Sequence, residues 1–387
     1  MSNYFAGGAN HPFILNKYPR VKRAQGPFLF TEDGKKLIDL WMGYGTVILG
    51  HADKGFTDFV CAQLKKGTLF SLPTNGEYEL AYLLVKIIPS AKKVKLALSG
   101  TEVINYSITL SRFVTGRKKI LTTKGSYHGA NVTFSDKTSK RLIDKVEFND
   151  FYETEKKLES NEYAAIIVEP VLCNSGVVLP EKGYLNFLRK KSKLTGTILI
   201  FDEVVTGFRV SIGGAQEYFK VIPDLSTFSK GMGNGIPISA LVGRKRLMDN
   251  FTPNGKVFFG GTFYSNPISV ASALYTIRQI RKNFKKILST SKYILNGIND
   301  SINDLKIEAC TTSIGSIISI FFSKEPPKNG SSLLKCDTNV YKKFSHIALK
   351  HGIFIPPFQN EPIFISLAHA EIKDEIIHKL YESFKGL

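Results

Sequence analysis

The stretch from Ile198 to Gly235 constrains the fold more than any other part of this 387-residue chain. Residues 198–201 are consecutive apolar side chains, as in a parallel strand buried on both faces, and the run stops at a carboxylate, Asp202. A second short strand is predicted over residues 225–229, and it ends at Lys230 before a glycine-rich turn. Because ligands of open α/β sheets bind beyond the carboxyl ends of the strands, the acid and the lysine can face one ligand.

One chemistry that needs both groups is that of pyridoxal 5'-phosphate. The lysine amine forms a Schiff base with the aldehyde of this cofactor, and the aspartate pairs with its protonated pyridine nitrogen. Once the substrate amine has displaced it, Lys230 stays beside the reacting carbon and can carry a proton from one carbon to the next. The plain alternative is a surface lysine in a glycine turn and an aspartate that caps a helix, and the spacing alone does not separate the two.

Several motifs resemble those of the class III aminotransferases of fold type I, and within them the glutamate-1-semialdehyde aminomutase family. In the family's order they are Asp202-Glu203-Val204, Thr206-Gly207-Phe208-Arg209, Pro223-Asp224-Leu225 and Ser229-Lys230-Gly231. The resemblance runs from about Gly7 to His369. It implies an α/β fold, the fold type I transferase fold that depends on pyridoxal phosphate. We therefore expect a mostly parallel central sheet flanked by helices, plus a smaller α+β domain.

The resemblance also implies three regions. Residues 1–45 are expected to form an N-terminal segment that packs on the small domain, and residues 46–268 to form the large cofactor-binding domain. Residues 269–387 are expected to form a linking helix and the C-terminal small domain. The linking helix has a start signal at Ser265-Asn266-Pro267, and we predict that it runs to about Asn283.

A candidate phosphate site follows a predicted strand over residues 94–98. Ser99, Gly100 and Thr101 come at the start of the next helix, where backbone N–H groups and the helix dipole can hold a phosphate. Taken alone, the motif also fits a simple helix cap. The resemblance implies that Gly100 and Thr101, with Ser99 beside them, bind the cofactor phosphate.

The remaining cofactor contacts come from the resemblance alone. It implies that Tyr127 stacks on the pyridine ring with His128 nearby, that Val204 covers the opposite face, and that Asn174 binds the ring oxygen. Without it, Tyr127 is an ordinary loop aromatic and Asn174 a turn amide. In the family, the threonine at the position of Thr262 reaches the cofactor phosphate in the other subunit, so the resemblance predicts a homodimer with shared active sites.

The substrate side departs from the aminomutase pattern. Glu361 matches a glutamate that faces the substrate in that family. By contrast, the family has a tryptophan at the position of Tyr44, a serine at that of His11 and a substrate-binding arginine at that of Ile14. Tyr44, Glu361 and His11 are the candidate substrate contacts. Isoleucine cannot replace an arginine fork that binds a carboxylate in two-point fashion. We therefore expect an amino acceptor without that carboxylate: a small ketone, an aldehyde or a keto-sugar, with a phosphorylated acceptor among the candidates.

The predicted function is that of a pyridoxal-phosphate aminotransferase. It would move an amino group from an amino acid, first of all L-glutamate, to such an acceptor by a ping-pong mechanism. The first alternative is amino transfer within one molecule, as in glutamate-1-semialdehyde 2,1-aminomutase. An alternative of another class is a non-catalytic basic binding protein on the same fold, against which the intact Lys230, Asp202 and Thr101 argue.

Bulk composition adds a few expectations. The net charge of +19 attracts anions, but the lysines are dispersed and no nucleic-acid-binding motif accompanies them, so we expect no nucleic-acid partner. The four cysteines and seven histidines lack the spacing of a metal site. The chain also shows no signal-peptide pattern and no apolar run of membrane-spanning length, so we expect a cytoplasmic protein without a membrane partner.

Overall fold

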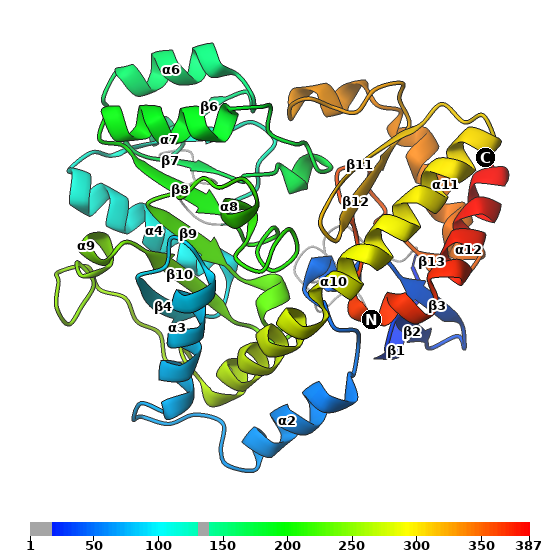
Figure 1. The fold of residues 1–387 in the computed structure, drawn as a ribbon, viewed down its shortest axis with the longest axis horizontal. Helices are drawn as coiled ribbons and strands as arrows, with labels where there is room; N and C mark the ends of the chain where they lie inside the picture. Colours follow the sequence, from blue (N-terminus) through cyan, green and yellow to red (C-terminus); the bar gives the residue numbers. More distant parts are fainter. Residues whose placement is uncertain (1–17, 131–138) are drawn as a thin grey trace, which may run out of the picture.

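A seven-stranded sheet forms the centre of the large domain in the computed structural model, which describes residues 18–130 and 139–387 (Figure 1). The strand order is β4-β10-β9-β8-β7-β5-β6, and only β10 runs against the others. The mostly parallel sheet predicted from the sequence is therefore confirmed. The strands are β4 (Lys93–Ala97), β5 (Lys119–Thr123), β6 (Ile143–Val146), β7 (Tyr163–Val168), β8 (Ile198–Asp202), β9 (Leu225–Phe228) and β10 (Ser239–Gly243).

Helices cover both faces of this sheet, which explains why its central strands are continuous apolar runs. On one face, α4 (Gly100–Thr115) packs Ile104 and Ile108 against strand residues such as Ile200. On the other face, α7 packs Leu188 against Phe201. The remaining helices of this domain are α2 (Lys54–Leu64), α3 (Asn75–Ile87), α6 (Phe151–Glu159), α7 (Tyr184–Leu194), α8 (Ala215–Tyr218) and α9 (Lys245–Met248).

A long helix, α10 (Pro267–Asp304), joins the two domains (Figure 1). Its start is capped by the side chain of Asn266, as the sequence signal indicated. Val270 packs in the core of the large domain, whereas Ile294 packs in the core of the small domain. The predicted end near Asn283 is wrong, because the charged middle of the helix merely crosses from one core to the other and contains no stop signal.

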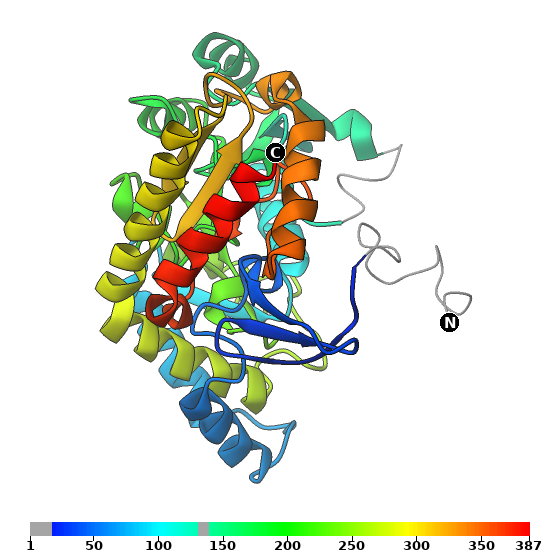
Figure 2. The ribbon, with the colours of Figure 1, turned by 90° about the vertical axis from the view of Figure 1, so that its right-hand side faces the viewer.

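The small domain combines both ends of the chain. One sheet has the order β1-β2-β3-β13 and a second has the order β11-β12-β14. Figure 2 shows α10 (yellow), α11 (orange) and α12 (red) side by side over these strands. Since β3 pairs in parallel with β13, the N-terminal strands share a sheet with the C-terminal region. The elements are β1 (Val21–Gln25), β2 (Phe28–Thr31), β3 (Lys36–Asp39), β11 (Cys310–Ile314), β12 (Ile317–Phe321), α11 (Thr338–Lys350), β13 (Ile353–Phe354), β14 (Ile363–Phe364) and α12 (Lys373–Lys385).

Some sequence predictions are not decided by this architecture. His11 and Ile14 lie outside the described residues, and the boundaries at residues 45 and 268 remain predictions. Across residues 18–130 and 139–387, every helix is too short or too polar to cross a lipid bilayer. The cytoplasmic location also remains a prediction.

Candidate active site

A cavity opens beyond the carboxyl ends of the central strands. Its walls come from segments that follow β4, β5, β7, β8 and β9, as expected for a ligand site of an open α/β sheet. The structure brings most of the predicted cofactor contacts together here, whereas Ser99, His128 and Thr262 are not part of the lining. The lining residues are Gly100, Thr101, Ile104, Tyr127, Gly129, Glu169, Asn174, Asp202, Val204, Val205, Ser229 and Lys230.

Asp202 ends β8 and is almost completely buried. Its Oδ1 accepts hydrogen bonds from the backbone N–H of Val204 at 3.1 Å and from the hydroxyl of Thr227 at 3.2 Å. Thr227 lies opposite Asp202 on the adjacent parallel strand β9. The second oxygen, Oδ2, lies 2.7 Å from Nδ1 of His128. The sheet therefore fixes the orientation of this carboxylate before any ligand binds.

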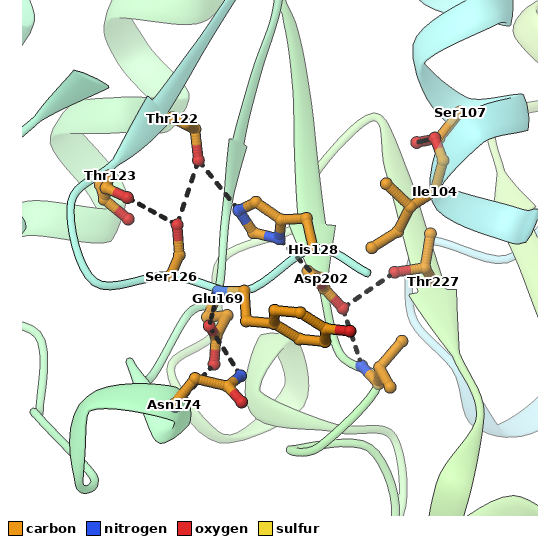
Figure 3. A network of polar contacts seen from close by, with 12 residues as sticks. Ile104, Ser107, Thr122, Thr123, Ser126, His128, Glu169, Asn174, Asp202 and Thr227 are labelled. Carbon is orange, nitrogen blue, oxygen red and sulfur yellow. Dashed lines mark hydrogen bonds and ion pairs between the residues drawn. The ribbon is translucent and has the colours of Figure 1, made fainter. Parts of the chain in front are cut away.

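His128 lies between Thr122 and Asp202 and contacts the carboxylate of Asp202 (Figure 3). Its ring is buried, and its Nε2 lies 2.9 Å from the hydroxyl of Thr122 on β5. A hydrogen-bonded chain thus runs from Thr122 through His128 to Asp202 and on to Thr227. The sequence placed His128 near the ring of the cofactor, and the structure gives it a definite partner, the carboxylate.

Lys230 follows β9 and lies in the cavity lining. Its backbone is in the left-handed region, with φ of 40°, which is strained for a residue with a Cβ atom and is typical of functional sites. The hydroxyl of Ser229 donates to the carbonyl of Ile238 at 2.8 Å and holds the start of this turn. Burial lowers the pKa of the Lys230 ammonium, and nearby carboxylates, first Glu361, offset part of this shift. More of this amine is therefore neutral and nucleophilic at neutral pH than of an exposed lysine.

The start of α4 lies at the cavity, which Gly100 and Thr101 line. Ser99 caps the helix: its hydroxyl oxygen accepts from the backbone N–H of Glu102, whose carboxylate accepts from the backbone N–H of Ser99 at 2.7 Å. The side chain of Ser99 is thus already engaged. Gly100 and Thr101 line the cavity, and a Cβ atom at Gly100 would come within 3.0 Å of Val204. Glycine therefore lets the start of α4 and the side chain of Val204 lie close together at the cavity.

Glu169 is a lining residue of the cavity that the sequence analysis did not select. This buried carboxylate follows the end of β7 and lines the cavity. Its Oε1 accepts from the backbone N–H of Tyr127 and the side-chain amide of Asn174, both at 3.0 Å, and its Oε2 accepts from the backbone N–H of Cys173 at 2.9 Å. Burial, together with the charge of Asp202, raises the pKa of Glu169. Glu169 therefore positions both Tyr127 and Asn174, two predicted cofactor contacts. Figure 3 shows Glu169 next to Asn174.

The candidate substrate side lies toward the small domain. Tyr44 packs on Trp41, with ring centroids 4.2 Å apart. Burial raises the pKa of the Tyr44 phenol, and the carboxylate of Glu361 adds to this shift. Because Glu361 also acts on the pKa of Lys230, the phenol, the carboxylate and the amine share one electrostatic environment.

Thr262 lies apart from this cavity. Its side chain is exposed and is not part of the cavity lining of its own protomer. The role of Thr262 at the site of another subunit therefore stays a prediction.

The residues of the cavity fit pyridoxal 5'-phosphate part by part. A helix start suits the phosphate, an aromatic and a β-branched side chain suit the two ring faces, a buried carboxylate suits the pyridine nitrogen, and an amine of lowered pKa suits the aldehyde. Among the described residues, no cluster of histidine, cysteine, aspartate or glutamate side chains is arranged to hold a metal ion.

Comparisons with known proteins agree with this site. The chain matches the family described as "Aminotransferase class-III" over residues 15–152 and 135–387. It is 39% identical to a glutamate-1-semialdehyde 2,1-aminomutase from Saccharolobus islandicus (strain L.S.2.15 / Lassen #1), with 97% of this chain and 93% of the relative covered.

Solved structures share the fold. An omega-transaminase from Sphaerobacter thermophilus aligns with a TM-score of 0.94 at 24% identity, over 99% of this chain and 95% of the other. A glutamate-1-semialdehyde-aminomutase from Pseudomonas aeruginosa PAO1, in complex with PMP, aligns with a TM-score of 0.90 at 22% identity, over 100% and 92%. The fold is that of the fold type I transferases, and the cofactor is pyridoxal 5'-phosphate. With its family profile matched along nearly the whole sequence, the chain belongs to the class-III aminotransferases.

Proposed function

We propose that this enzyme moves an amino group between two carbons of one substrate, in the manner of a 2,1-aminomutase. The observation that carries the proposal is the convergence of Lys230 and Asp202, from the ends of adjacent strands, on one cavity with an anion-binding helix start. The intramolecular outcome is supported by the aminomutase relative, which is 39% identical over 97% of this chain. Glu361, beside Lys230, matches the glutamate that faces the substrate in that family.

In this proposal each polar residue has a defined task. When bound, the cofactor supplies an aldehyde that condenses with primary amines and a ring that accepts the electron pair of a broken C–H bond. Lys230 provides the amine that holds the cofactor, and its lowered pKa favours the neutral form that this needs. Once the substrate amine replaces it, the same side chain moves a proton between neighbouring carbons. Asp202 keeps a proton on the pyridine nitrogen.

The remaining contacts orient the ring. Gly100 and Thr101 bind the phosphate through the N–H groups at the start of α4. Tyr127 and Val204 cover the two faces of the ring, and Asn174 binds its oxygen substituent. Ser99 holds the helix start in shape, and His128 keeps Asp202 oriented.

A second candidate is transfer between two molecules, from an amino acid to a carbonyl acceptor. The observation that favours it is Ile14, which stands where the aminomutase family has a carboxylate-binding arginine. His11 and Tyr44 differ from the aminomutase pattern as well. An acceptor without the matching carboxylate would suit these residues. A non-catalytic basic binding protein is least supported, because the cavity retains both Lys230 and Asp202.

One experiment separates the two candidates. The purified enzyme is loaded with the amine form of the cofactor and incubated with glutamate 1-semialdehyde alone. We expect the isomer with its amino group on the terminal carbon, measured by chromatography with mass spectrometry. The absorbance of the cofactor should return to that of the amine form after each turnover, because no second substrate takes the amino group.

The opposite pattern would support transfer between molecules. The enzyme loaded with the aldehyde form would then convert L-glutamate alone to its keto acid, with a lasting change in cofactor absorbance. A parallel set of small ketones, aldehydes and keto-sugars, with and without phosphate, would identify the acceptor. Lack of the isomer in the first experiment would rule out the aminomutase proposal.

We also propose that two copies of this chain form the working unit. The aromatic side chains of Phe258 and Phe263, on either side of Thr262, are largely exposed, as are Leu72 and Tyr78. A groove of about 960 Å³ between these two segments is lined by Tyr78 and by the glycines before Thr262. An apolar surface of this kind fits a second copy of the chain. The resemblance points the same way, because the threonine at the position of Thr262 reaches the other subunit in the family.

Subunit complementation tests this shared site. Lys230→Ala and Thr262→Asp are each expected to be inactive as homodimers, because one lacks the amine and the other repels the phosphate. Mixed dimers, formed by co-expression with two different tags, are expected to regain up to half of the wild-type activity. In them, one site combines an intact Lys230 with an intact Thr262 from the partner. Mixed dimers without activity would show that Thr262 serves its own protomer, and an active Thr262→Asp homodimer would show that Thr262 serves no site.

A further inference from the structure

Arg209 is a fully buried cation, and no residue of the described part of the chain neutralises it. Its exposed fraction is 0%, although arginine is among the residues most rarely buried. Among residues 18–130 and 139–387, the arginine ion pairs involve Arg189, Arg244 and Arg278, and no carboxylate pairs with Arg209. Burial lowers the pKa of its guanidinium to about 9. A charge kept in such a place calls for a reason beyond stability, since apolar residues usually fill buried sites at lower cost.

The guanidinium connects three segments that are distant in the sequence. Arg209 itself belongs to the turn after β8 that carries Asp202 and Val204. Its Nε donates to the carbonyl oxygen of Gly45 at 3.0 Å, and its Nη1 donates to the carbonyl of Ile365 at 3.1 Å and to the hydroxyl of Ser316 at 3.2 Å. The group also lies over the ring of Phe364, 4.8 Å from the centroid. One side chain thus ties the large domain to the small domain and to the segment around Gly45.

That segment, residues 42–45, is a turn of unusual conformation that we call the mouth turn. Its residues all have positive φ: 48° at Met42, 59° at Gly43, 59° at Tyr44 and 79° at Gly45. Non-glycine residues rarely adopt this conformation, so surrounding contacts must impose it. A Cβ atom at Gly45 would lie 2.7 Å from Phe364.

Two buried charged groups hold the mouth turn, one at each end. At the start, Oδ1 of Asp39 accepts from the backbone N–H groups of Trp41 and Met42 at 2.9 and 2.8 Å. At the end, Arg209 holds the carbonyl of Gly45. Tyr44, the candidate substrate contact, lies between them and shares the electrostatic field of Glu361.

We propose that Arg209 is a positioning residue that locks the mouth turn and the small domain over the cavity. In this way it fixes where Tyr44 and Glu361 stand relative to Lys230. Arginine suits the task because its planar fork reaches acceptors on separate segments, which a lysine ammonium cannot do in the same geometry. Carbonyl and hydroxyl acceptors bind Nε and Nη1, whereas Nη2 has no hydrogen-bond partner among the described residues. The aromatic ring of Phe364 adds a cation–π contact.

A direct substrate contact by Arg209 does not fit the structure. Its side chain is fully buried and is not part of the cavity lining. The guanidinium does approach the lysine segment, because a Cβ atom at Gly231 would lie 3.9 Å from Nε of Arg209. Arg209 therefore acts through the segments that it joins.

The single tryptophan of the chain, Trp41, reports directly on the mouth turn. It is buried, and it packs on Tyr44. In cofactor-free protein, Arg209→Lys is expected to shift the emission of Trp41 to longer wavelength and to increase its quenching by acrylamide. Gly45→Ala, which disturbs the same turn without removing the guanidinium, is expected to do the same. Arg189→Lys, in an ion pair with Asp224, is the matched control and should leave the emission unchanged.

Cofactor readouts separate positioning from a general structural role. The phosphate and ring contacts come from the large domain, so the dissociation constant for pyridoxal phosphate should stay near the wild-type value in Arg209→Lys. Hydroxylamine, a small amine that attacks the bound aldehyde, should react faster because the mouth is less well closed. With the substrate of the proposed function, kcat/KM should fall on the order of 10²-fold, mostly through KM.

The fluorescence test needs no substrate, so it decides on Arg209 whether or not the proposed function is right. The proposal is overturned if Arg209→Lys leaves the emission of Trp41 unchanged, even if Gly45→Ala shifts it. A matching loss of cofactor affinity in Arg209→Lys overturns it as well, because the arginine would then support the whole fold. If Arg209→Lys fails to fold, an unshifted emission in Gly45→Ala overturns the proposal and a shift with normal cofactor affinity supports it.

Discussion

Replacing Lys230 by alanine is expected to remove the covalent bond to the cofactor and nearly all turnover. The same amine attaches the cofactor and moves the proton, and loss of a positioned acid–base group alone typically costs about 10²–10⁴-fold in rate. The cofactor should still bind without a covalent bond, because the start of α4, Asp202 and Val204 remain. Borohydride reduction followed by peptide mass spectrometry measures the attachment, and steady-state turnover measures the loss.

Lys95 provides an internal control within the wild-type protein. Burial lowers the pKa of its ammonium too, but its Nζ donates to the carbonyl of Thr252, away from the cavity. A lowered pKa alone should not suffice, so the adduct is expected on Lys230 and not on Lys95. An adduct mainly on Lys95, or normal turnover in Lys230→Ala, would contradict the assignment of the catalytic lysine.

The sequence alone placed the two central residues because their strands are buried on both faces. The continuous apolar run before Asp202 appears as β8, a fully buried strand, and the shorter run before Lys230 appears as β9. A strand that is buried on both faces can be recognised from its continuous apolar sequence, without knowledge of the neighbouring strands. Their carboxyl ends meet in a parallel sheet, so the position of the cavity follows from the pattern.

The same signal pointed to Glu169, but the sequence analysis did not use it. Residues 164–168 are consecutive apolar side chains, and the structure shows β7 ending one residue before this carboxylate. An acid directly after a fully buried strand, beside two similar strand ends, was sufficient reason to include it. Its partners could not be predicted, because Tyr127 is 42 residues away in the sequence.

Other features depend on contacts that a single sequence does not reveal. His128 pairs with Asp202 across 74 residues, and Arg209 reaches Gly45 across 164 residues. The left-handed mouth turn depends in part on this distant contact of Arg209, since neither Met42 nor Tyr44 favours the conformation. Helix α11 was not predicted at all, because its apolar face becomes evident only against the core of the small domain.

Replacing Asp202 by asparagine is expected to leave most of the cofactor bound and to lower kcat on the order of 10²–10³-fold, as for other preorganised electrostatic groups. Asparagine has the same shape, so its oxygen can still accept from Val204 and Thr227. Its amide can donate to Nδ1 of His128 if the ring proton moves to Nε2, where Thr122 accepts. The geometry is thus retained, whereas the negative charge that keeps a proton on the pyridine nitrogen is lost.

Asp224→Asn is a suitable control for this variant, because Asp224 is also buried and charged but binds Arg189 and Arg244 outside the cavity. It should lower the melting temperature and leave kcat near the wild-type value. Cofactor content and kcat, measured for both variants, separate a fault in the fold from a fault in the chemistry. If Asp202→Asn turned over as fast as the wild type, the ring nitrogen would have to be protonated by another group. Glu169 would then be the nearest carboxylate to consider, since it lines the same cavity and its raised pKa makes it the better proton holder.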